Sequence, residues 1–523
     1  MLYSFLRNEP LKNKTKSKLT TSTKTVNCLV NMLGWTSERD TDMRLFAAKV
    51  TAKMADNLRV ASVPGAMQLI ASLLNSAHVQ KMKDPLLDNC SPEPEQGNPI
   101  EEAGGNEQTT QMFKWLKQMA IYCFIPREEP TNMDEQKTNI LRCCWKGSIP
   151  EEEPSTDTDL LPVLGMLILD KLASFDLENC IEISRAIGLM SKIIEFTSNQ
   201  TDMTCINEIG QLKTSSLKVL GRLSRTEGEF GVTVRQKISE HPFLLSHLAE
   251  ILDDSRSSQK LRKLTIKLLR NLAMDRNINQ EIGQIPVIIS KLIHAFLKQG
   301  EPSTTGSDQT LSGQALAILA MDSAKNCLAM LAEEGDVFIK ELADMIKDAK
   351  SCYVASSLLR DICVHARSKL GIWNLQEISS ILGKVLEGIM DAEGKGAELE
   401  VLVGLSSQIC KVIPEDFARE LEHGQIREGF IERLVSVLNT NTPTAHCPGI
   451  RRVIVEHAIY MMECNPGYAN CFIECKMIEA LLEVERKPSR AEKYKFFLGD
   501  AGLMEHAIPL SALVSKAKEL MKP

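Results

Sequence analysis

One pattern of apolar residues recurs after three prolines and constrains the fold of this 523-residue chain more than any other feature. Pro64, Pro242 and Pro286 superimpose without gaps, and each is followed by apolar residues three, six and ten positions later. This spacing places one apolar stripe along a helix, with the proline in the first turn, where an amide hydrogen has no intrahelical partner in any case. The sequence therefore predicts equivalent amphipathic helices after these three prolines.

A second motif accompanies the prolines. Residues 268–273 (LLRNLA) resemble 168–173, 219–224 and 327–332, and 50–55 is a weaker copy. The small residue that ends the motif lets neighbouring helices approach closely. Pro242 and Pro286 lie 44 positions apart, and helical units of about 40–47 residues that cannot bury their own apolar face are typical of an α-solenoid. No alternating strand pattern stands out, so we expect an all-α, right-handed superhelix of stacked repeats.

These two motifs together resemble the armadillo repeat. In that family a proline such as Pro286 opens the second helix, and an Asn-Leu-Ala motif such as 271–273 closes the third. Asn57, Asn179 and Asn277 follow the second motif, where the family often has asparagine. The resemblance implies an armadillo-like right-handed α-solenoid from about residue 26 to residue 520.

The segment Lys49–Leu74 is also similar to the plant armadillo-repeat superfamily that includes brassinosteroid-enhanced grass proteins. Members of that family often have an N-terminal hydrophobic, membrane-associated region, and this sequence has none, so it is expected to be a short form or a partial product. The 15 cysteines are scattered along a long chain, which favours reduced thiols in the cytoplasm over a secreted disulfide framework.

Breaks in the helical pattern divide the chain into segments. The stretch from Asp84 to Glu107 contains acids, prolines and two adjacent glycines but no lysine or arginine, which is typical of a flexible linker. The expected segments are a disordered basic tail (1–25), an N-terminal armadillo-like repeat (26–78), irregular acidic linkers with a short helix (79–159), well-formed armadillo-like repeats (160–300), and degenerate armadillo-like repeats with a C-terminal cap (310–520).

Motifs of catalysis and metal binding are not found in the sequence. There is no phosphate-binding glycine loop, no Gly-x-Ser-x-Gly and no His-Glu-x-x-His. Cys464, Cys471 and Cys475 lie near His457 and Cys447, but they lack the Cys-x-x-Cys pair that zinc sites prefer and suit helix packing equally well. We therefore expect no enzymatic activity, no cofactor and no metal. The formal net charge of −7 also argues against general nucleic-acid binding.

In armadillo proteins the third helices line a groove in which partners lie. The resemblance implies that two positions on each third helix face this groove, one and five residues before the last apolar residue of the motif. Nuclear-import carriers have asparagine and tryptophan there, whereas the four tryptophans of this chain, at 35, 115, 145 and 373, fall elsewhere. The residues found at or beside these positions are mainly basic, and they are Lys49, Lys53, Lys171, Lys218, Arg222, Lys267, Arg270 and Asn271.

This basic row predicts a non-catalytic scaffold or adaptor that binds a protein or peptide along its groove, with an acidic peptide as one candidate. A solvated helix face would show the same residues. Two other functions remain open at this stage. One is a substrate-recruiting subunit of a ubiquitin-ligase-type assembly. The other is an adaptor held at a membrane by the N-terminal tail, which contains Lys12, Lys14, Lys16, Lys18 and Lys24.

Overall fold

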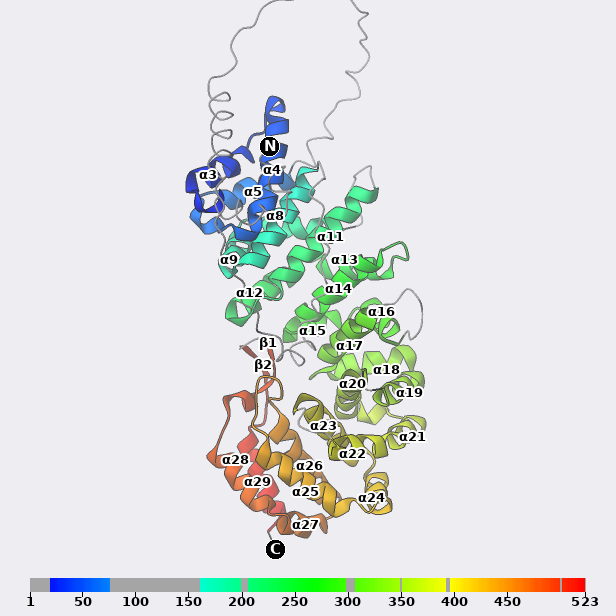
Figure 1. Cartoon of the computed structure of the whole chain (residues 1–523). Helices are drawn as coiled ribbons and strands as arrows, with labels where there is room; N and C mark the ends of the chain where they lie inside the picture. Colours follow the sequence, from blue (N-terminus) through cyan, green and yellow to red (C-terminus); the bar gives the residue numbers. More distant parts are fainter. Residues whose placement is uncertain are drawn as a thin grey trace, which may run out of the picture. The chain divides into compact units, whose positions relative to one another are not determined.

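The computed structural model describes residues 19–75, 160–198, 206–297, 306–348, 350–391, 396–498 and 501–522. The chain divides into two compact units, residues 1–222 (unit 1) and 223–523 (unit 2). Both consist of helices packed in successive groups of three (Figure 1), called here the first, second and third helix of a repeat. The predicted all-α, armadillo-like solenoid is confirmed.

Unit 1 begins with an incomplete repeat and continues with two further repeats. In the middle repeat two short 3-10 turns stand where a first helix would be. Helix α8 packs against both α4 and α5 and is buried along most of its length. The elements are α3 (Thr23–Met32), η1 (Glu38–Asp40), α4 (Thr41–Met54), η2 (Ala55–Asn57), η3 (Val60–Ser62), α5 (Ala66–Leu74), α8 (Leu161–Phe175), α9 (Leu177–Arg185), α10 (Leu189–Glu195) and α11 (Ile206–Leu223).

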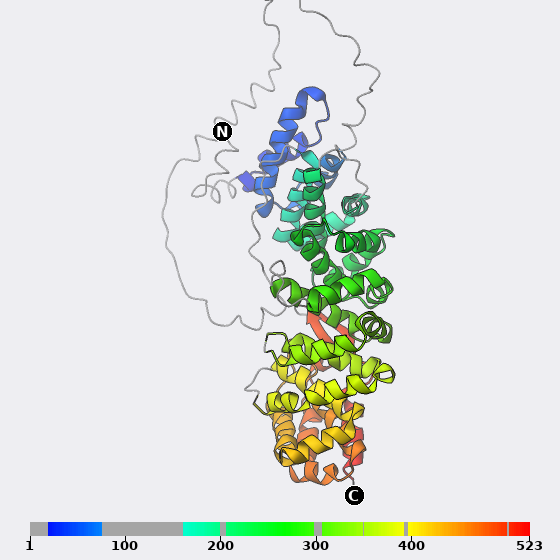
Figure 2. The same cartoon turned by 90° about the vertical axis from the view of Figure 1, so that its right-hand side faces the viewer.

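Unit 2 contains regular helix triplets up to its C-terminal end, including the part expected to be degenerate. Its helices follow one another in chain order from green to red (Figure 2). They are α12 (Gly228–Ser239), α13 (Leu244–Asp253), α14 (Gln259–Leu272), α15 (Arg276–Ile282), α16 (Pro286–Leu297), α17 (Gly306–Ala320), α18 (Ala324–Glu334), α19 (Asp336–Ile346), α20 (Cys352–His365), η4 (Arg367–Lys369), α21 (Ile372–Ser380), α22 (Leu382–Asp391), α23 (Gly396–Val412), α24 (Pro414–His423), α25 (Arg427–Thr440), α26 (Ile450–Cys464), α27 (Tyr468–Glu474), α28 (Met477–Arg486) and α29 (Leu510–Leu520).

The third helices of unit 2 form a continuous row. Helix α14 packs on α17, α17 on α20, α20 on α23, α23 on α26 and α26 on α29. One predicted copy of the second motif is misplaced in this row, because 327–332 lies in α18, a first helix. The true third-helix copy is 317–322 in and just after α17, whose sequence AILAMD matches RNLAMD at 270–275.

The three prolines occupy two different positions. Pro286 is the first residue of α16, as predicted. Pro64 and Pro242 instead precede α5 and α13 by two residues. Before α5 the turn is completed by Gly65, whose φ of 74° lies in the left-handed region that favours glycine. All three prolines therefore mark the start of a second helix, although only one lies inside it.

A set of buried asparagines joins successive repeats. The amide of Asn179 donates to the carbonyl oxygens of Leu58 (2.8 Å) and Leu172 (3.1 Å). In unit 2 the equivalent residues are Asn279 and Asn326, and the Asn326 amide donates to Asn279 Oδ1 at 2.7 Å. Asn277, expected to hold this role, is exposed, as is Asn57. The asparagine register of this repeat is thus two residues later than predicted.

The structure differs from the sequence prediction in two irregular segments. Two short strands, β1 (Tyr494–Leu498) and β2 (Ala501–Glu505), pair antiparallel between α28 and α29, although no strand was expected. Helix α3 starts inside the expected tail, and Leu19 is buried. The rest of that tail, residues 1–18, and the whole of the acidic linkers with their short helix (79–159) lie outside the described residues.

Candidate functional site

The basic residues expected in unit 1 lie on its three third helices. Lys49 and Lys53 are on α4, Lys171 is on α8, and Lys218 and Arg222 are on α11. All five are partly exposed. Their long aliphatic stems can cover apolar surface while the charged ends reach solvent. The recurrence on successive third helices agrees with the position that the sequence pattern assigned to them.

Two of these cations bind acids of the preceding repeat. Lys171 Nζ lies 3.5 Å from the carboxylate of Asp56. The guanidinium of Arg222 forms a close ion pair with Asp170, whose side chain is only 5% exposed. A buried carboxylate needs a charged partner, so Arg222 has a structural role between α8 and α11. Lys49, Lys53 and Lys218 are partly exposed and are candidates for contact with a partner.

The remaining predicted residues lie on α14 of unit 2. Lys267 is partly exposed, whereas Arg270 and Asn271 are 8% and 2% exposed. Asn271 donates to Ser224 Oγ at 3.0 Å, and Arg270 donates to Gln314 Oε1 on α17 at 2.9 Å. Burial and the nearby charge of Arg225 lower the pKa of Arg270 to about 10. Both residues thus connect neighbouring elements of the unit and present little surface to a ligand.

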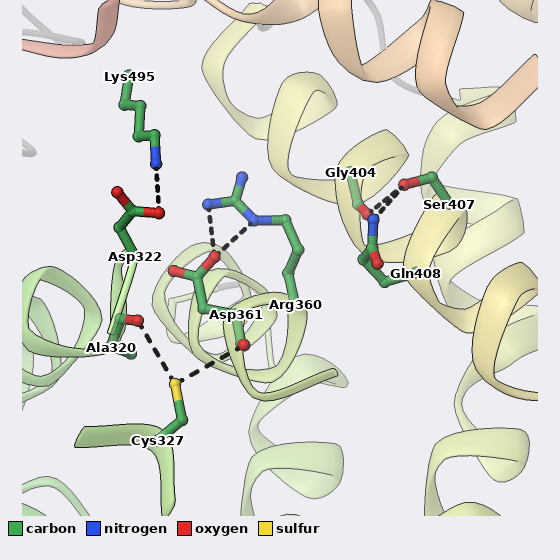
Figure 3. Close-up of polar contacts among 9 residues, drawn as sticks. All are labelled: Ala320, Asp322, Cys327, Arg360, Asp361, Gly404, Ser407, Gln408 and Lys495. Carbon is green, nitrogen blue, oxygen red and sulfur yellow. Dashed lines mark hydrogen bonds and ion pairs between the residues drawn. The ribbon is translucent and has the colours of Figure 1, made fainter. Parts of the chain in front are cut away.

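The position of Asn271 continues along the row of third helices with other polar residues. Asp361 on α20, Gln408 on α23 and Tyr460 on α26 stand at the same place, one residue before an apolar pair. Figure 3 shows Arg360 donating to Asp361, and Gln408 donating to Ser407, which in turn donates to the carbonyl oxygen of Gly404. The sequence pattern did not identify Asp361, Gln408 and Tyr460 as site candidates. The repeated Ile-Cys at 362–363 and 409–410 was the signal that could have aligned them.

Charged residues around the turn between α17 and α18 form a second cluster. Asp322, in the turn between α17 and α18, lies 2.9 Å from Lys495 and 3.5 Å from Arg276. Burial opposes ionisation of Asp322, but the hydrogen bond and charge of Lys495 outweigh it and lower the pKa of Asp322 below its usual value. Burial raises the pKa of Glu400 to about 8 despite the opposing charge of Arg360.

Burial suppresses ionisation of several cysteines in the described part of the chain. Burial raises the pKa of Cys180 to about 11, and the negative charge of Asp176 adds to this effect. Burial likewise raises the pKa of Cys363 to about 12, with a smaller contribution from the charge of Asp361. Reactive thiols have lowered pKa values. Every cysteine in the described part of the chain is a free thiol, and the residues described include no group of three or more His, Cys, Asp or Glu able to hold a metal ion.

No family model matches the sequence, and no curated protein matches it. Among solved structures, the crystal structure of an engineered protein, Northeast Structural Genomics Consortium target OR497, aligns over 100% of this chain and 98% of that chain, with 12% identity and a TM-score of 0.56. A designed armadillo repeat protein, YIII(Dq)4CqI, aligns over 51% of this chain and 99% of that chain, with 13% identity and a TM-score of 0.37. The first likeness concerns the fold alone.

These comparisons leave the similarity to plant proteins a prediction. Among the described residues, no helix is both long and apolar enough to cross a membrane. The fold itself narrows the functional classes, because armadillo-like solenoids commonly present an extended surface that binds other proteins.

Proposed function

We propose that this chain is a non-catalytic scaffold that binds a protein partner, and that the third helices of unit 1 contact an acidic segment of that partner. The observation that carries the proposal is the recurrence of partly exposed cations on α4, α8 and α11. Cations that face one surface attract an acidic ligand even when the whole chain is acidic. The partner is therefore defined by its charge.

The residues proposed to contact the partner are Lys49, Lys53 and Lys218. Lys171 on α8 and Arg222 on α11 belong to the same set of cations and form ion pairs with Asp56 and Asp170. Lys267 on α14 of unit 2 is proposed as a further contact of the same kind. Arg270 and Asn271 are left out of the contact set, because they are buried and bonded to neighbouring residues.

The test compares two triple charge reversals in the full chain. The first is Lys49→Glu, Lys53→Glu, Lys218→Glu. The matched control is Lys24→Glu, Arg39→Glu, Arg185→Glu, which changes net charge equally at exposed positions outside the third helices of unit 1. The probe is a fluorescent decaglutamate peptide, and circular dichroism first establishes that each variant is folded.

We expect the first variant to bind the peptide about tenfold or more weakly than the wild type, since three lost attractions of about 0.5–1 kcal/mol each reach that ratio. The control should bind within about twofold of the wild type. Equal weakening in both variants would reduce the effect to overall charge and reject the site. Unchanged binding in both variants would also reject it, as would no binding by the wild type.

A further inference from the structure

The segment between α28 and α29 departs from the repeat pattern of unit 2. It contains η5 (Arg490–Lys493) and the two strands. In both views of the molecule the strands, drawn in red, lie among the green helices from the middle of the unit (Figure 1 and Figure 2). The segment therefore leaves its own repeat and lies against earlier repeats.

The base of this insertion is firmly attached to α26. Arg451 donates to the carbonyl oxygen of Lys487 at 2.8 Å and pairs with Glu492 at 3.3 Å, and both side chains are 7% exposed. Arg452 donates to the carbonyl oxygen of Ile508 at 2.6 Å. Two neighbouring arginines thus hold the start and the end of the insertion, so its two ends stay close together.

The hairpin itself has little to stabilise it internally. Its strands pair with each other, and no third strand joins them in the part of the chain that the structure describes. Across the ladder the ring of Tyr494 covers Gly502, where an added Cβ would lie 2.4 Å from the ring. An isolated two-stranded hairpin is at best marginally stable in water. Its position must therefore depend on the surface against which it lies.

Contact with that surface includes one ion pair. Lys495 on β1 binds Asp322 at 2.9 Å (Figure 3), and the next residue, Phe496, is 7% exposed. Asp322 follows α17, whereas the base of the hairpin is on α26, and α20 and α23 lie between these helices in the row. The hairpin therefore runs along the face formed by these third helices.

The same face has an unused acceptor for positive charge. Asp361 is 5% exposed, and its Oδ2 has no hydrogen-bond partner among the described residues, while its Oδ1 accepts from Arg360. Burial lowers the pKa of His365, and the nearby charges of Asp361, Asp322, Lys495 and Arg360 also act on it. The two carboxylates therefore belong to one cluster. An orphaned buried carboxylate oxygen is costly, and a further cationic donor would remove that cost.

We propose that the hairpin is a displaceable internal ligand, and that the face beneath it binds an extended segment of a partner that presents a lysine or arginine to Asp322 and Asp361. Lys495 shows this chemistry in the chain itself. The firm base and the weakly held strands allow the hairpin to leave while α26 and α29 stay in place. This site is separate from the cations of unit 1 and does not rest on them.

The geometry of the base permits a clean deletion. The amide of His506 donates to the carbonyl oxygen of Lys493 at 2.9 Å, so residues 494–505 can be replaced by a two-residue Asn-Gly turn, which closes antiparallel strands readily. The probe is a fluorescent peptide of residues 494–505, closed by a disulfide between cysteines added at its two ends. The control peptide carries Lys495→Glu, and the control protein combines the deletion with Asp322→Asn.

We expect the deletion variant to bind the peptide about tenfold or more tightly than the intact chain, because its face is vacant. The Lys495→Glu peptide and the Asp322→Asn protein should each weaken binding about tenfold. Equal binding to the intact and deleted chains, or binding to neither, would overturn the proposal. Loss of α-helical structure on deletion would also overturn it, since the hairpin would then be an integral part of the fold.

Hydrogen exchange on the intact protein provides a second measurement that needs no deletion. Amides of β1 and β2 should exchange about tenfold or more faster than those of α20 and α26, and Lys495→Glu should increase the hairpin rate further while leaving the helices unchanged. Strand amides as protected as those of α26 would show that the hairpin does not leave its surface, and the proposal would fail.

Discussion

The fully buried His457 on α26 offers a stability test whose sign and size follow from its surroundings. Its ring lies between Phe417 and Phe430, with centroid distances of 5.5 Å and 5.4 Å in edge-to-face geometry. The side chain is 0% exposed, and neither ring nitrogen has a hydrogen-bond partner among the described residues. Burial lowers the pKa of His457 to about 3. The ring is therefore neutral at physiological pH.

The magnitude follows from proton linkage. The unfolded chain takes up a proton at this side chain near its ordinary pKa of 6.5, whereas the folded chain does so only near pH 3. Between these values acid therefore favours unfolding, by about 1.4 kcal/mol per pH unit. This contribution to stability is present above pH 6.5 and declines as the pH falls. At pH 5 the loss relative to pH 7.5 is about 2 kcal/mol.

The assay compares the wild type with His457→Leu, which keeps a similar volume and removes the titrating group. Urea denaturation of the full chain, followed by circular dichroism at pH 7.5 and pH 5, gives the free energy of unfolding at each pH. We expect the wild type to lose about 2 kcal/mol more than the variant between the two values. The difference isolates His457, because other titrating groups are common to both proteins.

A second histidine, His506, allows an independent test of the same reasoning. Burial and the charges of Arg452 and Lys495 also lower its pKa to about 3, so His506→Gln should reduce the acid sensitivity independently of His457. If the wild type and His457→Leu lose the same stability between pH 7.5 and pH 5, the aromatic pocket does not exclude the proton and the reasoning is wrong.

Three further predictions concern bonds between repeats and thiol reactivity. Asn279→Ala should destabilise the chain by about 2–3 kcal/mol in urea denaturation, because it removes the donor to the carbonyl oxygen of Ile318 (2.8 Å) and the side-chain acceptor of the Asn326 amide. Asn277→Ala, at an exposed position, should change the stability by less than about 0.5 kcal/mol, and equal effects would refute the ladder. Arg222→Ala should cost about 3 kcal/mol in the same assay by removing the guanidinium that pairs with buried Asp170, whereas a loss below about 1 kcal/mol would assign the pair to solvated surface. Iodoacetamide at pH 8 should modify exposed Cys464 well before buried Cys363, as measured by mass spectrometry, because burial raises the pKa of Cys363; equal rates would contradict this.

The repeat could be predicted from the sequence because its signals are local. The apolar stripe after Pro286 and the small residue after Leu272 both act within one helix or between adjacent helices, so spacing alone reveals them. The asparagine ladder was harder to place. Asn277 and Asn279 both lie on the short helix α15, and only Asn279 faces α17, whose carbonyl it bonds. A two-residue difference in register is decided by packing, which one sequence does not reveal.

The candidate contact residues show the same limit. Lys49, Lys53 and Lys218 are partly exposed on their helices, but Asn271, chosen by the same counting rule, and Arg270 beside it are buried and bonded to Ser224 and Gln314. The rule assigns residues to third helices. It does not determine whether the neighbouring helix approaches closely enough to cover those residues.

The hairpin could not have been found by these means, because its stability does not come from its own sequence. Phe496 and Phe497 have strand-forming character, but Gly499 and Gly502 weaken it, and a five-residue strand gives little periodic signal. What fixes it is non-local: Arg451 and Arg452 hold its ends from α26, and Asp322 binds Lys495 from the turn after α17. A segment held mainly by such contacts is also one that a partner can replace, since a competing segment needs to reproduce only the lysine that binds Asp322. The feature that hid the hairpin from sequence analysis is thus the feature that makes it exchangeable.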